Sequence, residues 1–191
     1  MEKTQKLRLK TSKSRVKKFK NTSFSAKKQK ANIYIDGANM FYAQKHLGWF
    51  IDWKKIYKYL NYENDILEVR YYTGIKNNDQ KMEKYLSYLR KIGFITNTKP
   101  LKVIKNKNNT LLYKSNCDIE IAVDLLMHVN MYKYAIILSG DSDFVYLVKI
   151  LQKQFQKKVI IISSRQTMSW EMKLSADKYI FLEDIKKEVV R

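Results

Sequence analysis

Acidic side chains follow two short apolar segments, at the point where each segment ends. The stretch AIILSGDSDF (135–144) ends in Asp141 and Asp143, and NIYID (32–36) ends at Asp36. If both segments are parallel strands and neighbours in one sheet, their carboxyl ends meet at the edge where sites form. We therefore expect the three carboxylates to converge. The alternative for each aspartate is a turn or helix-cap role, which DG and GDSD also suit.

A fourth carboxylate comes from the segment CDIEIAVDLLMHVNMY (117–132), which the apolar spacing predicts to be a helix. At about 100° per residue, Ala122, Leu125 and Val129 fall within about 40° of Asp118. Asp118 therefore lies on the apolar side of the first turn, where a carboxylate needs a reason other than solvation, unless it is the N-cap. The same geometry puts Asp124 on the polar side and leaves its place in the site doubtful.

Four converging aspartates predict a cation site, because their mutual repulsion has to be relieved by a proton or a cation. Oxygen ligands without Cys or His suit Mg²⁺ or Mn²⁺. Such ions activate water and stabilise the leaving oxygen in phosphodiester hydrolysis. A calcium loop is excluded because DSDFVY lacks its third ligand and its glycine, and the chain has no phosphate-binding GK[ST] loop.

Three neighbouring polar residues could support such a site. Asn39, three residues after Asp36, could orient a water or a phosphate, and Ser139 could hydrogen-bond a metal ligand. Lys114, just before the Asp118 helix, could contact a backbone phosphate. Each of the three could equally be a turn or surface residue.

Apolar patterning predicts an α/β fold with a mainly parallel central sheet, since strands alternate with helices. Asp52 is the expected N-cap of one helix, Asn78 that of the next, and Gly93 the point where that second helix stops. A hairpin is expected over 101–114. The expected strands cover 32–35, 66–75, 94–98, 134–139, 158–163 and 179–182, and the expected helices cover 52–61, 78–93, 117–132 and 142–155.

The net charge of +20 is concentrated at the start of the chain. Residues 1–30 carry twelve Lys or Arg and one acidic residue, with few apolar residues, so we expect a disordered basic arm. An arm that binds RNA, an organellar transit peptide and a solvated tail without a role all fit this composition. Lysine outnumbers arginine 32 to 6, as coding bias alone can produce, so the charge of the remaining residues says less.

Composition also limits the cellular setting. The single Cys117 excludes an internal disulfide framework and a four-cysteine zinc site, and favours a reducing, cytoplasmic compartment. The organellar alternative applies if the arm is a transit peptide. No apolar run approaches the ~18 residues of a membrane span. We expect the basic arm at 1–30, one domain at 31–185 and a tail at 186–191.

Four blocks of the chain resemble the NYN domain, in particular its LabA-like branch, within the PIN-like nuclease superfamily. They occur in the order of the family and cover most of residues 31–185: NIYIDGANMFY (32–42), KSNCDIEIAVDLL (114–126), YAIILSGDSDFVYLVKILQKQFQKKVIIIS (134–163) and ADKYIFLEDI (176–185). One departure is QKK (156–158), where the family usually has a glycine before the fifth strand.

The resemblance implies a three-layer α/β/α sandwich and a metal-dependent nuclease site, with RNA as the expected substrate. The positions that match the motifs of the family are Asp36, Asn39, Asp118, Asp141 and Asp143, together with Asp124, an aspartate common in this branch. We therefore expect a Mg²⁺- or Mn²⁺-dependent endoribonuclease with four aspartate ligands. The alternatives are an RNA-binding module that does not cleave and, more weakly, a phosphatase-like hydrolase using Asp141 covalently. The RNA substrate, the cleavage mode and any homo-oligomeric state stay open.

Overall fold

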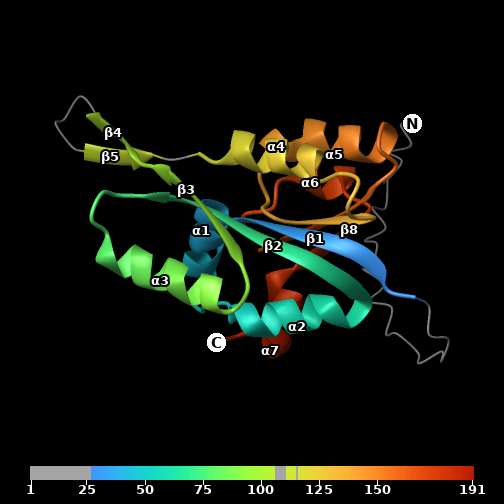
Figure 1. Cartoon of the computed structure of the whole chain (residues 1–191), viewed down its shortest axis with the longest axis horizontal. Helices are drawn as coiled ribbons and strands as arrows, with labels where there is room; N and C mark the ends of the chain where they lie inside the picture. Colours follow the sequence, from blue (N-terminus) through green and yellow to red (C-terminus); the bar gives the residue numbers. More distant parts are fainter. Residues whose placement is uncertain (1–26, 106–110, 115) are drawn as a thin grey trace, which may run out of the picture.

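Six parallel strands form a single sheet in the computed structural model (Figure 1). The model describes residues 27–105, 111–114 and 116–191, with the backbone alone for 102–105 and 111–114. The strand order is β3-β2-β1-β6-β7-β8, and every neighbouring pair is parallel. The strands are β1 (Gln29–Asp36), β2 (Asn64–Ile75), β3 (Ile95–Pro100), β6 (Tyr134–Leu138), β7 (Lys158–Ser163) and β8 (Lys178–Phe181).

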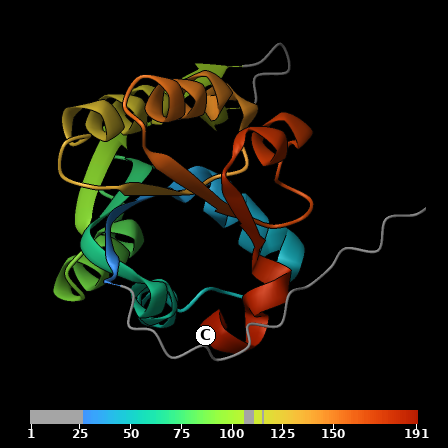
Figure 2. The ribbon, with the colours of Figure 1, turned by 90° about the vertical axis from the view of Figure 1, so that its right-hand side faces the viewer.

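Helices cover both faces of this sheet, which confirms the expected α/β/α sandwich (Figures 1 and 2). One face packs against α1 (Gly37–Leu47), α2 (Trp53–Glu63), α3 (Gln80–Lys91) and α7 (Lys186–Val189). The other packs against α4 (Asp118–Met127), α5 (Val145–Lys153) and α6 (Trp170–Ser175). Two short 3₁₀ turns, η1 (Ser142–Phe144) and η2 (Leu182–Ile185), complete the domain.

The second helix shows how sequence leads to packing. Asp52 caps α2 by accepting hydrogen bonds from the backbone N–H groups of Lys54 and Lys55, as predicted. Trp53, Ile56 and Leu60 are buried against the sheet, each contributing on the order of 2 kcal/mol through removal from water. Tyr57 on the same helix is 37% exposed, because it lies at the margin of this buried stripe.

Three helix predictions need correction. The sequence did not indicate α1, whose buried residues are Gly37, Met40 and Ala43. The predicted helix 117–132 ends at Met127, because the chain turns there to enter β6. The N-cap of α3 is Asp79 rather than Asn78: Asp79 Oδ1 accepts the N–H of Met82, while Asn78 takes a left-handed φ of 61°.

The predicted boundaries shift at both ends of the domain. Gln29 and Lys30 already belong to β1, and residues 1–26 of the predicted arm lie outside the described residues. Residues 186–191, expected to be a tail, include α7, whose Val189 is buried, and Val190 pairs with Ile51. They therefore close the core beside α2.

The predicted hairpin is an antiparallel pair, β4 (Lys102–Lys105) and β5 (Leu111–Lys114), which is separate from the main sheet. Its turn at 106–110 lies outside the described residues. No helix in the described part of the chain is both long and apolar enough to cross a bilayer.

Candidate metal and nuclease site

The central strands β1 and β6 are neighbours, so their carboxyl ends lie together as expected. Ile35 pairs with Leu138 at the end of the shared register. Asp36 follows directly and caps α1, because its Oδ1 accepts the N–H of Asn39 at 3.0 Å. Its Oδ2 accepts the hydroxyl of Ser139 at 3.2 Å. The two strand ends are thus joined through one carboxylate.

Two glycines permit this close approach. A Cβ on Gly37 would lie 2.6 Å from the carbonyl oxygen of Tyr72 and 2.8 Å from the ring of Tyr71. A Cβ on Gly140 would lie 2.1 Å from the carbonyl oxygen of Thr167. The DG and SGD motifs therefore need glycine so that neighbouring backbones can pack beside the aspartates.

Asn39 and Ser139 organise the loop that carries the acidic pair. The amide oxygen of Asn39 accepts the N–H of Gly140 at 3.2 Å and the hydroxyl of Ser163 at 3.4 Å. The Ser139 hydroxyl oxygen accepts the N–H of Asp141 at 3.3 Å. The structure therefore gives Asn39 a role in holding the loop, and its orientation of a water or a phosphate stays a prediction.

Asp141 combines the two roles that the sequence left open. It caps η1, since its Oδ1 accepts the N–H of Asp143 at 3.0 Å. At the same time, one carboxylate oxygen from each of Asp118, Asp141 and Asp143 lies within 4.8 Å of the others. The turn thus aims both aspartates at the start of α4.

Asp118 is the first residue of α4 but does not cap it. The N-cap is Cys117, which makes no side-chain capping bond, and the N–H of Asp118 donates to Asn116 Oδ1 at 3.0 Å. Burial raises the pKa of Asp118, and the charges of Asp141 and Asp143 raise it further. The cluster therefore carries the repulsion that a cation would relieve.

Asp36 borders this cluster without joining its tightest group. It is 8% exposed and lines the same cleft as Asp118 and Asp141. Burial is the main cause that raises the pKa of Asp36, and the charge of Asp118 adds to it. Among the described residues, only the other three predicted ligands share the 4.8 Å group.

Asp124 lies elsewhere. Its Oδ2 accepts the hydroxyl of Tyr72 at 2.7 Å and forms an ion pair with Arg70 at 3.3 Å. The backbone carbonyl of Asp124 accepts from His128 Nδ1, whose Nε2 faces Arg70 at 3.1 Å. Because arginine only donates, this contact fits the Nδ1–H tautomer of His128, with Nε2 as the acceptor. Asp124 therefore anchors α4 to β2.

The contacts of Lys99 are described by the structure, whereas those of Lys114 are not. The side chain of Lys114 lies outside the described residues, so its predicted phosphate contact stays a prediction. Lys99, which sequence reasoning missed, forms an ion pair with Glu120 at 2.6 Å and donates to the carbonyl of Asn116 at 3.2 Å. It thereby fastens the start of α4 to β3, a long-range contact with no local sequence signal.

Asp36, Asp118 and Asp141 open into a large cleft of about 1340 Å³. Phe41 and Tyr42 line it and are 58% and 57% exposed, so their rings are open to a ligand. Tyr72 and Phe144, two further aromatic residues near the carboxylates in the sequence or in the fold, are core residues with 1% exposure. Other lining residues that the sequence did not indicate are Phe50, Thr73, Gly74, Lys81, Lys84, Tyr85 and Tyr88.

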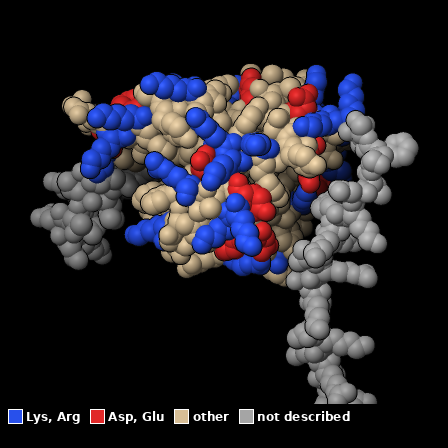
Figure 3. All heavy atoms as spheres, turned by 90° about the horizontal axis from the view of Figure 1, so that it is seen from below, with Lys and Arg blue, Asp and Glu red and all other residues tan. Residues whose placement is uncertain are grey.

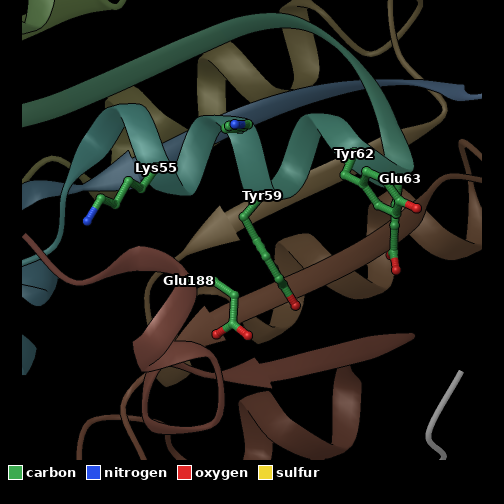
Figure 4. Close-up of a pocket in the computed structure, with 6 residues that line it drawn as sticks. Lys55, Tyr59, Tyr62, Glu63 and Glu188 are labelled. Atoms are coloured by element: carbon green, nitrogen blue, oxygen red, sulfur yellow. The ribbon is translucent and has the colours of Figure 1, made fainter.

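A second, smaller hollow of about 430 Å³ lies between α2 and α7 (Figure 4). Figure 4 shows Tyr59 extending from α2 into the space between Glu188 and the end of the helix that carries Tyr62 and Glu63. Burial raises the pKa of Tyr59, and both carboxylates add to this effect. Glu63 already pairs with Lys178 at 3.1 Å, and no predicted site residue lines the hollow.

Comparisons with known proteins agree with this geometry. The NYN domain family model matches residues 30–183. The low amplitude and bright protein LabA of Synechococcus elongatus is 33% identical over 158 residues, which cover 81% of this chain and 84% of that protein. The crystal structure of a protein of unknown function from Vibrio parahaemolyticus aligns with a TM-score of 0.72 at 22% identity, covering 86% of this chain and 97% of that one, which shows a shared fold.

Proposed function

The chain belongs to the NYN domain family, and we propose that it is a Mg²⁺- or Mn²⁺-dependent endoribonuclease that hydrolyses RNA phosphodiesters. Membership of this family and an acidic cluster at the sheet edge fit a nuclease. The observation that carries the proposal is the convergence of Asp118 with Asp141 and Asp143, which come from separate elements. A local turn alone would not recruit a carboxylate from α4.

In this proposal the chain supplies an all-oxygen cradle. Asp118, Asp141 and Asp143 would hold the cation, while Asp141 Oδ1 also caps η1. Asp36, fixed by Ser139, completes the acidic edge. A bound Mg²⁺ or Mn²⁺ would supply an activated water and neutralise charge on the phosphate. Oxygen-only ligands match the preference of both ions.

RNA is the proposed substrate, and the basic residues of positions 1–30 are proposed to raise affinity for it. Their twelve lysines and arginines would replace counterions along the phosphate backbone. Binding should therefore weaken steeply with salt. Removal of residues 1–26, which leaves β1 intact, should flatten that dependence and leave the cleft unchanged.

The deciding experiment incubates the purified protein with labelled RNA or DNA in Mg²⁺, Mn²⁺ or EDTA. Cleavage should require metal and should fall at least about 100-fold in Asp118→Asn and Asp141→Asn. Asp65→Asn is a matched control, because Asp65 is exposed at the other end of β2. Cleavage that persists in both site variants would show a contaminant. Metal-independent RNA binding without cleavage would favour the RNA-binding alternative.

A further inference from the structure

The cleft that contains the carboxylates is also lined by one face of α3. Lys81, Lys84, Tyr85 and Tyr88 all contribute to it, at the i, i+3, i+4, i+7 spacing of residues that share a helix face. Seven residues of helix rise about 10 Å, which is the length of about three stacked nucleotides. The cleft is therefore long enough for about three nucleotides along α3, in addition to a phosphate at the carboxylates.

Exposed aromatic rings distinguish this part of the cleft. Phe50 is 62% exposed and Tyr88 is 38% exposed, in addition to Phe41 and Tyr42 on α1. The rings of Phe41 and Tyr42 meet edge to face at 5.7 Å between centroids. Flat rings that are open to solvent are the usual platforms for nucleobases, whatever their sequence.

The rings beneath this surface are rigidly packed. Trp53 and Tyr71 meet edge to face at 5.6 Å between centroids, and Tyr71 meets Tyr85 at 5.8 Å. The indole N–H of Trp53 donates to the Tyr85 hydroxyl. Trp53 and Tyr71 are nearly fully buried, at 3% and 5% exposure. These three rings line the same cleft, so part of its wall is fixed by side-chain packing.

Cations are available at the same place. Lys81 and Lys84 are exposed, and neither takes part in an ion pair with the described side chains. Figure 3 shows Lys and Arg spread over the face seen from below, with acidic residues among them. General attraction to phosphates is therefore widely distributed, and selectivity has to come from the aromatic cleft.

We propose that the α1–α3 side of the cleft binds about three unpaired nucleotides next to the scissile phosphate, so that the substrate is single-stranded. The bases stack on Phe50, Tyr88 and the Phe41–Tyr42 pair, while Lys81 and Lys84 contact the backbone. Paired bases in a double helix have no free ring face, so a duplex cannot use these platforms. This inference rests on the proposed nuclease function and specifies its substrate.

The test measures binding of the full-length protein to fluorescent oligonucleotides in EDTA, at about 0.15 M salt. The probes are a short single-stranded RNA, the single-stranded DNA of the same sequence, and the RNA duplex. Phe50→Ala and Tyr88→Ala should each weaken single-strand binding by about tenfold and change duplex binding by less than twofold. Comparing RNA with DNA shows whether the cleft also senses the 2′-hydroxyl.

Tyr62→Ala is the matched control, because Tyr62 is 81% exposed and lines the hollow of Figure 4 rather than the cleft. Its affinity for all three probes should equal that of the wild type. Unchanged single-strand binding in both cleft variants, or equal losses for single strand and duplex, would overturn the inference. Thermal unfolding of each variant verifies that the fold is kept.

Failure of the inference can be told apart from failure of the proposed function. Cleavage in Mg²⁺ and binding in EDTA are therefore measured separately on the wild type and on both cleft variants. If the wild type never cleaves but the cleft variants still lose single-strand affinity, nucleotide binding by the cleft stands without the nuclease. If the wild type cleaves and the cleft variants bind normally, the nuclease stands without nucleotide binding by the cleft.

Discussion

The hydroxyl of Tyr72 donates a 2.7 Å hydrogen bond to Asp124 Oδ2 and so ties α4 to β2. Burial raises the pKa of Tyr72, and its bond to Asp124 raises it further, so the phenol stays protonated and donates. Arg70 binds the same oxygen at 3.3 Å, with its side chain 14% exposed. Asp124 is therefore held by the protein on the sheet side of α4, away from the three clustered carboxylates.

Asp124→Asn should lower the free energy of unfolding by about 2 kcal/mol, because it removes a charged partner from a mostly buried guanidinium. Tyr72→Phe should cost about 1 kcal/mol, since it removes one hydrogen bond. Urea unfolding measures both changes.

Metal affinity separates a structural role of Asp124 from a ligand role. Mn²⁺ titration should give Asp124→Asn an affinity close to that of the wild type, whereas Asp118→Asn should lose most of its affinity. An Asp124→Asn protein of normal stability that has lost Mn²⁺ binding would make Asp124 a ligand after all.

Asp143→Asn should not lower the free energy of unfolding as Asp124→Asn does, because Asp143 lies in a cluster of like charges. In EDTA, Asp143→Asn should keep or raise the free energy of unfolding, by up to about 1 kcal/mol, because one of three crowded charges is removed. Saturating Mn²⁺ should stabilise the wild type by about 2.7 kcal/mol at a hundredfold excess over its Kd. The variant should lose most of that gain.

Thermal unfolding with and without Mn²⁺ provides the comparison, with Asp65→Asn as the control that keeps the wild-type response. If Asp143→Asn gains as much stability from Mn²⁺ as the wild type does, Asp143 is not a ligand. If it is markedly less stable in EDTA, the three carboxylates do not repel one another as the geometry indicates.

The strands and the acidic edge could be predicted because their signals are local. β6 and β7 are apolar runs of strand length, β1 ends at Asp36, and Asp141 and Asp143 follow β6 within a few residues. Parallel neighbours then bring Asp36 and Asp141 to the same edge whatever the details of packing. The convergence of these carboxylates follows from topology alone.

The missed features depend on packing between distant segments. The buried face of α1 consists of Gly37, Met40 and Ala43, a narrow stripe, while Phe41 and Tyr42 point into the cleft. The largest apolar side chains of α1 are therefore exposed and its smaller ones are buried, so the apolar pattern does not mark the buried face. The helical wheel separated Asp124 from Asp118, as the structure does, but its placement of Asp124 on the polar side was wrong. Asp124 faces β2, and its partners there lie more than fifty residues earlier in the chain.

The family usually has a glycine in the turn before β7, and the backbone of this chain shows why. Gln156 takes a φ of 52°, the left-handed region that glycine adopts without strain. A non-glycine residue costs about 1–2 kcal/mol there, and the extra chain entropy of glycine offsets part of this. Gln156→Gly should therefore raise the free energy of unfolding by about 0.5–1 kcal/mol.

Urea unfolding checks this change, and Gln156→Ala is the matched control, because alanine keeps the same steric cost. The carbonyl of residue 156 accepts from Lys133 Nζ at 3.2 Å, a backbone contact that both variants retain. A less stable Gln156→Gly protein would mean that the glutamine side chain contributes more than the strain costs.

Asp177 predicts how stability depends on pH away from the cleft. Burial raises its pKa, but bonds from Lys158 at 2.7 Å, the N–H of Val159 at 2.9 Å and Gln152 at 2.8 Å outweigh burial and hold the pKa of Asp177 below its ordinary value. A carboxylate with a lowered pKa stabilises the fold above its unfolded pKa of about 3.9. This contribution is lost as the pH falls through the lower, folded value.

Asp177→Ala should accordingly cost about 2 kcal/mol at pH 7, because the N–H of Val159 also loses its acceptor. The difference from the wild type should shrink when unfolding is measured at successively lower pH below about 4. Asp184→Ala serves as the control, since its partner Arg165 and its own side chain are both more than half exposed and the pair is worth little. A gap between Asp177→Ala and the wild type that stays constant down to low pH would show that the carboxylate acts through packing and not through its charge.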